Sequence, residues 1–175
     1  MPNEFRPQRT YTIRPAREAD AEAIAVLANA LGQQEGGPGD LMTGTIVRKH
    51  ILSDGSGIGV LVADQAGDVV GYCFHTVSFE SAFAARGRYI IDLFVAERAR
   101  RRGIATALLA EVALISESQG GVYIHWLANQ AGAGARELYA ELADISQPVT
   151  GYAVTRQNFD RLVKLARQNA HLDDD

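Results

Sequence analysis

The stretch "LFVAERARRRGIATALLAEV", residues 93–112, joins an apolar run to a run of good helix formers. The preceding "RYIIDLFV" (88–95) is rich in β-branched and aromatic residues and predicts a buried strand. The following "GIATALLAEVALISES" (103–118) has apolar residues at helical spacing and predicts a helix. Four arginines and a glycine lie at the joint, although the net charge of the chain is −4: Arg98, Arg100, Arg101, Arg102 and Gly103.

A strand that turns into a helix through glycine creates a place for an anion. Glycine lets backbone N–H groups approach a ligand closely, and the first N–H groups of a helix have no partner within the helix. The helix dipole makes that end positive, and arginines add charged donors. The joint therefore suits a phosphate, although a solvated basic turn explains the same residues equally well. The Walker pattern and the G-x-G-x-x-G pattern are both absent from the sequence.

The rest of the chain supplies strands and helices in a readable order. We predict strands over 10–16, 58–64, 69–78, 88–95, 122–129 and 149–155, and helices over 17–31, 41–52, 103–118, 134–142 and 158–168. A turn at 65–68 and a longer loop at 79–87 join three strands into an antiparallel meander. The long helix then leads to a parallel strand.

This order predicts an α/β (α+β) fold with a mixed, mostly antiparallel central sheet flanked by helices. The 175 residues suggest one domain over 1–175, with a loose arm at 1–9 and an acidic tail at 171–175.

The composition excludes several classes of protein. The pI of about 5.6 argues against a nucleic-acid partner. No apolar run approaches the roughly 20 residues of a membrane span, and "MPNEFRPQRT" lacks the apolar region of a secretory signal, so we expect a cytoplasmic protein. Cys73 is the only cysteine and lies in a predicted buried strand, so neither an intrachain disulfide nor a multi-cysteine zinc site is expected. No His, Asp or Glu grouping has metal-ligand spacing, and we expect no metal.

The joint resembles a known motif. The segment Arg100-Arg101-Arg102-Gly103-Ile104-Ala105 fits Q/R-x-x-G-x-G/A, the acyl-CoA pyrophosphate motif of the GNAT superfamily of N-acetyltransferases. The opening "TIRPAREADAEAIAVLANAL", the later "ARELYAEL" and the order of elements are similar to that family over about residues 10 to 155. The C-terminal "GYAVTRQNFDRLVKLA" resembles the diamine (spermidine/spermine) acetyltransferase branch.

The resemblance implies an acetyl-CoA site around the joint. Backbone N–H groups of 101–106 would bind the pyrophosphate, with Gly103 allowing close approach and the small Ala105 leaving room. Main-chain groups near Phe94 and Val95 would pair with the pantetheine arm, where a bulge in the family aims an N–H at the thioester carbonyl. The implied cofactor-binding residues are Phe94, Val95, Arg100, Arg101, Arg102, Gly103, Ile104, Ala105, Thr106 and Asn129.

This chain departs from the family pattern at two of these positions. Arg101 replaces a frequent glycine. The family also often has an asparagine seven residues before its tyrosine. That position is Gly132 here, so Asn129 is the candidate to do the same work.

The resemblance also implies two catalytic residues. Tyr139 matches the family tyrosine that protonates the leaving thiolate. Asp92 lies in the strand that leads to the motif and would bind the cationic amine or relay its proton. The diamine enzymes have an acidic pair here, whereas this chain has Ile91-Asp92, and a strand-end carboxylate satisfied by its neighbours is an open alternative. Glu80 is a second candidate for contact with the acceptor, whereas His75 and His125 are expected to be ordinary strand residues.

These expectations define the function to be tested. The leading hypothesis is an acetyl-CoA-dependent N-acetyltransferase that acts on a primary amine of a cationic small molecule by direct attack in a ternary complex. Two alternatives stay open: a non-catalytic acyl-CoA-binding module, and a protein acetyltransferase acting on lysine or an N-terminus. Exposed sheet edges, common in such folds, also leave a homodimer open.

Overall fold

A computed structural model describes residues 10–128 and 133–170 of the chain. The chain divides into two compact units with the boundary between Ala133 and Gly134, and each is described by itself. The prediction of a single domain over 1–175 stays a prediction. The arm at 1–9, the tail at 171–175, and both Asn129 and Gly132 lie outside the described residues.

The first unit is built on a five-stranded sheet with the strands in chain order. Its strands are β1 (Thr12–Pro15), β2 (Ile58–Gln65), β3 (Asp68–Glu80), β4 (Ala85–Val95) and β5 (Ile124–Trp126). From β1 to β4, each strand pairs antiparallel with the next one. The chain then crosses over through the helix α3 (Ile104–Ser118) to β5, which pairs in parallel with β4. The predicted mixed, mostly antiparallel sheet, its meander and its parallel crossover are therefore confirmed.

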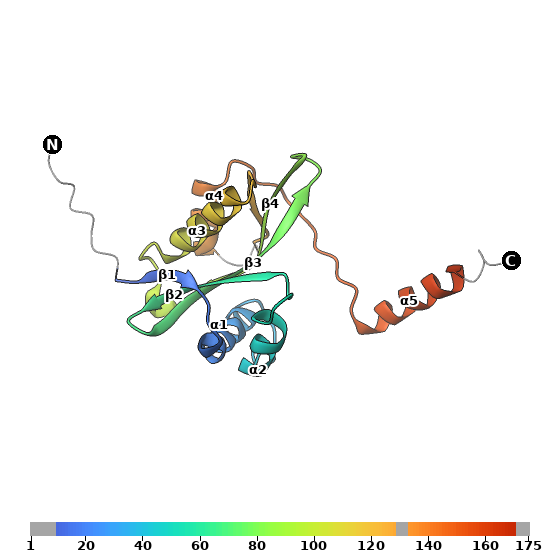
Figure 1. Cartoon of the computed structure of the whole chain (residues 1–175), viewed down its shortest axis with the longest axis horizontal. Helices are drawn as coiled ribbons and strands as arrows, with labels where there is room; N and C mark the ends of the chain where they lie inside the picture. Colours follow the sequence, from blue (N-terminus) through green and yellow to red (C-terminus); the bar gives the residue numbers. More distant parts are fainter. Residues whose placement is uncertain (1–9, 129–132, 171–175) are drawn as a thin grey trace. The chain divides into compact units, whose positions relative to one another are not determined.

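Helices cover both faces of this sheet (Figure 1). On one face lie α1 (Ala21–Gln34) and the short α2 (Gly44–Ile46), which continues into a π-helical turn over Val47–Ile51. Ile24 of α1 and Tyr72 and Phe74 of β3 form the core there. On the other face α3 buries Ile104, Leu108 and Val112 of its predicted apolar stripe, each at most 2% exposed, whereas the fourth residue of that stripe, Ile115, is half-buried.

Cys73 is fully buried within β3, as expected. Burial raises the pKa of its thiol to about 12, which leaves the thiol protonated and unreactive at neutral pH.

The hairpin between β3 and β4 is longer than the sequence predicts. The ladder extends to Glu80 and Ala85, so the loop predicted over 79–87 shrinks to residues 81–84. Tyr123 explains the extension, because its ring packs against Phe83 at 5.0 Å between centroids and its hydroxyl lies 3.1 Å from Ser78 Oγ. A two-stranded hairpin is only marginally stable on its own, and the Tyr123 side chain stabilises this end of the β3–β4 hairpin.

The second unit contains α4 (Ala133–Leu142) and α5 (Arg156–Ala170), which confirms the two predicted C-terminal helices. The strand predicted over 149–155 is wrong, because that segment has no regular secondary structure. Its apolar residues, including Val149, Tyr152 and Val154, are exposed by 52–94%. Favourable β-propensity by itself does not make a strand.

Among the described residues, no helix is both long and apolar enough to span a membrane. Over the same residues, no group of three or more His, Cys, Asp and Glu side chains could hold a metal ion.

Candidate active site

An extra residue in β4 sets up the site. On β3, Phe74 pairs with Asp92, whereas the next residue, His75, pairs with Ile90, so Ile91 is left as a bulge. Side chains four apart in a regular strand face the same side. Here Arg88 binds Gln119 at the end of α3, on the opposite face of the sheet from the α1 side that Asp92 faces. The bulge therefore turns Asp92 from the α3 face to the α1 face.

The bulge also opens one edge of β4. Parallel pairing with β5 ends at Ile90 and Trp126, the last pair of the described ladder. Beyond it, the Ala96 N–H donates to Val70 on β3 at 2.8 Å, so Phe94, two residues earlier, also directs its main chain to β3. Val95 directs its main chain to the opposite edge, which has no ladder partner at this position among the described residues; this edge is called the open edge below.

This register directs the main chains of Phe94 and Val95, both predicted to contact pantetheine, to opposite edges of β4. The Phe94 main chain is paired with Tyr72 on β3, so Val95 is the better candidate for contact with the cofactor. A bulge was expected near Phe94 and Val95, and the structure has it at Ile91. The contact of either residue with the cofactor stays a prediction.

The joint between β4 and α3 forms a concave backbone. Arg101 and Gly103 both have left-handed backbones, with φ of 61° and 75°, and α3 begins at the next residue. A left-handed residue followed by a right-handed one, as at Gly103 and Ile104, turns successive N–H groups toward one point, and this arrangement suits an anion. The unpaired N–H groups of Ile104, Ala105 and Thr106 at the helix start extend it. The glycine that the family often has at the Arg101 position suits this conformation.

The arginines of the joint do not act alike. Arg98 lies in an exposed ion pair with Asp68 at 2.7 Å. Arg100 folds back, donating from Nε to the Val95 carbonyl at 2.9 Å and from its terminal nitrogen to Gln34 at 3.0 Å. Arg101 and Arg102 are exposed and have no ion-pair partner among the described residues. They are therefore the arginines most available to a phosphate.

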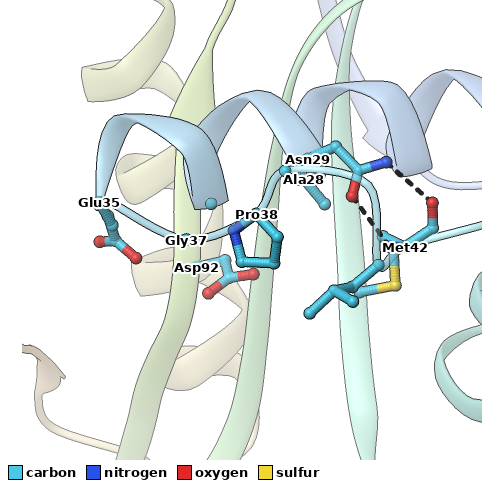
Figure 2. Close-up of a pocket in the computed structure, with 10 residues that line it drawn as sticks. Ala28, Asn29, Glu35, Gly37, Pro38, Met42 and Asp92 are labelled. Carbon is cyan, nitrogen blue, oxygen red and sulfur yellow. Dashed lines mark hydrogen bonds between the residues drawn. The ribbon is translucent and has the colours of Figure 1, made fainter.

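A cavity of about 540 Å³ lies between α1, the loop that follows it, and β4. Its lining is Ala28, Asn29, Gly32, Glu35, Gly37, Pro38, Gly39, Leu41, Met42 and Asp92. Asn29 exchanges two hydrogen bonds with the main chain of Met42, at 2.8 and 2.9 Å, and so ties the loop to α1 (Figure 2). The volume is in the usual range for a small-molecule site.

Asp92 is the partly buried carboxylate of this cavity. Burial raises its pKa, the hydrogen bond from the Tyr72 hydroxyl at 3.3 Å lowers it, and the negative charge of Glu35 raises it again. Tyr72 is fully buried, and burial together with the Asp92 charge raises the pKa of its hydroxyl. Tyr72 therefore acts on Asp92 as a neutral donor that fixes the direction of the carboxylate.

Glu35 lines the cavity, although nothing in the sequence marks it as a candidate. It caps the C-terminus of α1, where Gly36 has a φ of 85° and Gly37 N–H bonds to the Gly32 carbonyl at 2.8 Å. This pattern is a Schellman motif, and it fixes where Glu35 leaves the helix. The glycines of "QQEGGPGD" signalled the end of the helix, but no sequence signal placed that end beside Asp92.

The two strand histidines lie apart from the cavity lining. His75 is buried, and its Nδ1 accepts a hydrogen bond from Arg88 at 2.8 Å. Burial, with a contribution from the Arg88 charge, lowers the pKa of His75 to about 4, so it is a neutral core residue as expected. His125 lies 3.3 Å from Glu80, and neither of them lines the cavity. Tyr139 lies on α4, in the second unit.

The comparisons with known proteins agree with this architecture. The model of the acetyltransferase (GNAT) family matches residues 17–143. An integron cassette protein from the mobile metagenome of V. cholerae shares the fold with a TM-score of 0.73 and 22% identity, over 89% of this chain and 98% of that one. A ribosomal-protein-alanine N-acetyltransferase from Brucella melitensis biovar Abortus 2308 does so with a TM-score of 0.66 and 23% identity, over 83% and 99%.

A third solved structure is an aminoglycoside N-acetyltransferase in complex with CoA. It has a TM-score of 0.63 and 15% identity, over 83% of this chain and 99% of that one. No curated protein sequence matches the chain. The structural likenesses show a shared fold, and the family model covers well over half of the sequence. The chain therefore belongs to the GNAT family of acetyltransferases, and its activity is that of an N-acetyltransferase.

Proposed function

We propose that this protein transfers an acetyl group from acetyl-CoA to a primary amine of a cationic small molecule, by direct attack within a ternary complex. One observation carries the proposal. A single strand, β4, directs Asp92 into the cavity and, three residues later, presents the main chain of Val95 at an edge that leads into the anion-binding joint. Acceptor and acyl donor would thus meet along one strand.

The cofactor side is assigned to the joint. Acetyl-CoA supplies an acetyl group on a thioester whose sulfur is a good leaving group. The N–H groups of Gly103, Ile104 and Ala105 would hold its pyrophosphate, and Arg101 and Arg102 would add charge. At the open edge, the Val95 N–H would lie beside the thioester. A fixed donor there would stabilise negative charge that develops on the carbonyl oxygen.

The acceptor side is assigned to the cavity. Asp92 would take a proton from the bound ammonium, directly or through water, because only the neutral amine has a lone pair to donate. The nitrogen then forms a bond to the carbonyl carbon and releases its second proton, and the carbon–sulfur bond breaks with its electron pair on sulfur. Tyr139 is proposed to give its hydroxyl proton to that thiolate, and the proton released by the nitrogen would restore the Tyr139 hydroxyl through water. Asn129 stays a proposed contact of the cofactor.

The cavity favours a small molecule over a protein acceptor. Structures that share this fold include acetyltransferases for aminoglycosides and for a ribosomal protein, so the fold alone does not choose between acceptor classes. A cavity of about 540 Å³, bounded on one side by the loop that Asn29 ties to Met42, has the volume of a small-molecule site.

The test is thiol release from acetyl-CoA across a panel of amines and lysine peptides. We expect amine-dependent release, a drop of roughly 100-fold in kcat for Asp92→Asn, and a drop of at least about tenfold for Tyr139→Phe, in line with general acid–base catalysis. Tyr152→Phe is the matched control, because Tyr152 is 94% exposed in the same unit as Tyr139 and has no assigned role.

Two results would overturn the proposal. Acetyl-CoA binding without amine-dependent release by any acceptor would identify a non-catalytic binding module. Turnover of lysine peptides in preference to every small amine would identify a protein acetyltransferase.

A further inference from the structure

The open edge of β4 is covered by a side chain of the protein itself. Arg100 Nε donates a hydrogen bond to the Val95 carbonyl at 2.9 Å, on the edge that the acyl donor would need. We propose that Arg100 selects the acyl donor: it covers this edge until a pyrophosphate in the joint draws its guanidinium away. The inference rests on the proposed function and adds a preference for CoA thioesters over thioesters that lack the pyrophosphate.

Three contacts hold the guanidinium across the edge. Besides the Val95 carbonyl, it donates to Gln34 Oε1 at the end of α1 at 3.0 Å, and it lies 5.4 Å from the centre of the Phe94 ring. Among the residues that the structure describes, Arg100 forms no ion pair, so both hydrogen bonds go to neutral oxygen atoms. Each contact contributes a modest free energy at an exposed side chain, so a ligand can displace them.

This arrangement competes directly with the acyl donor. In an extended strand, the N–H and the carbonyl of one residue point to the same side, so both groups of Val95 face the open edge. A pantetheine arm that pairs with this edge in a strand-like manner would donate an amide N–H to the Val95 carbonyl. That is the oxygen that Arg100 holds. The donor must therefore displace the guanidinium before it can pair with β4.

A pyrophosphate in the joint offers the guanidinium a better partner. Arg100 directly precedes Arg101 and lies three residues before Gly103, the two positions with left-handed backbones. A phosphate oxygen carries a negative charge, which the oxygens of Val95 and Gln34 lack, and arginine can bind phosphate through two parallel hydrogen bonds. CoA would thus replace the contacts that it breaks, whereas pantetheine alone would not.

The exchange predicts that one substitution has opposite effects on two donors. Arg100→Ala removes the guanidinium that pantetheine must displace, so the affinity for pantetheine should rise about five- to tenfold, as expected for one or two hydrogen bonds of ordinary strength. CoA is spared the same competition but loses a phosphate contact of greater strength, so its affinity should fall about two- to threefold.

The experiment is an NMR titration of the isotope-labelled full chain, with CoA and pantetheine as separate probes. The shift of the Val95 N–H reports binding at the edge and requires no turnover. In Arg100→Lys, the charge stays available to a phosphate, but lysine lacks the planar fork that bonds two oxygens at once. This variant should bind pantetheine as tightly as Arg100→Ala does and keep its affinity for CoA within about twofold. Gln34→Ala removes only the second anchor and should raise the affinity for both probes about twofold.

Arg98→Ala is the matched control, because Arg98 lies two residues earlier and pairs with Asp68 on the surface. It should bind both probes as the wild-type protein does. Weaker binding of both probes to Arg100→Ala would overturn the inference and make Arg100 a support of the edge. Unchanged binding of pantetheine to that variant would also overturn it, because the guanidinium would then not compete for the Val95 carbonyl.

Binding is measured without an amine, which separates this inference from the proposed function. Opposite changes in the two affinities, in a protein that acetylates no amine, would support the inference while the proposed function fails. Acetylation of amines by the wild-type protein, together with unchanged pantetheine binding in Arg100→Ala, would overturn the inference alone. No binding of CoA to the wild-type protein would overturn both.

Discussion

Replacing Gly103 by alanine tests whether backbone geometry or charge holds the acyl donor. Gly103 has a φ of 75°, where an L-residue costs roughly 1–2 kcal/mol. A Cβ built there would touch only the Tyr11 hydroxyl, at 3.5 Å, which is an ordinary contact. The cost to the free protein therefore comes from the backbone alone, and we expect the melting temperature of Gly103→Ala to fall by about 3–6 °C.

The loss of ligand binding should be larger than this strain suggests. The new methyl group would stand where a pyrophosphate oxygen must approach the N–H groups at the start of α3. At a concentration of 100 times Kd, acetyl-CoA should stabilise the wild-type protein by about 2.7 kcal/mol. A tenfold loss of affinity would reduce this gain to about 1.4 kcal/mol, so the ligand-induced shift should halve. Differential scanning fluorimetry with and without acetyl-CoA measures both quantities.

Arg101→Gly is the informative counterpart. Arg101 also has a left-handed backbone, with a φ of 61°, so glycine should relieve strain and raise the melting temperature of the free protein by up to about 3 °C. It removes one exposed charge and should weaken acetyl-CoA binding only about two- to threefold. A larger loss of binding in Arg101→Gly than in Gly103→Ala would refute the backbone cradle and return the joint to a basic surface turn.

Three further predictions concern the sheet and the cavity. Tyr72→Phe removes the hydrogen bond that lowers the pKa of Asp92, so the acid limb of the kcat/KM profile should move up by about half a pH unit; an unmoved limb would exclude Asp92 as the titrating base. His75 has a folded-state pKa of about 4, below its ordinary value, so the unfolded chain binds the proton more readily, and stability should fall by up to about 3 kcal/mol as the pH drops from 6.5 to 4. An NMR titration that shows His75 protonated at pH 6 would contradict this. Asn29→Ala frees the loop at Met42 and should raise KM for the amine several-fold without changing KM for acetyl-CoA, as measured by steady-state kinetics.

Much of the fold could be predicted because its signals are local. The helical stripe of Ile104, Leu108 and Val112 and the glycine before it lie within a few turns of chain, and the structure buries that stripe as predicted. The meander also follows from short connections between β-rich runs. The strand predicted at 149–155 fails for the opposite reason. It depended on a neighbouring strand, which propensity does not reveal.

The candidate site could be predicted only where the chemistry lies on one segment. Asp92 was found because a carboxylate in an apolar strand stands out, and the joint was found because its glycine and arginines are contiguous. Glu35 and Tyr72 were missed because each becomes part of the site only through contacts between elements far apart in the chain. Glu35 reads locally as the last residue of a helix, and Tyr72 as a core aromatic.

The bulge at Ile91 explains why the sequence alone does not predict which face of the sheet each side chain of β4 points to. A regular strand from Arg88 to Asp92 would place both side chains on the α3 face, and the Asp92 carboxylate would then point away from the cavity. One extra residue reverses every later side chain and, with it, the direction of the main chain at Val95. The same insertion therefore turns Asp92 into the cavity and Val95 toward the open edge. The two halves of the proposed reaction thus depend on one irregularity in a single strand.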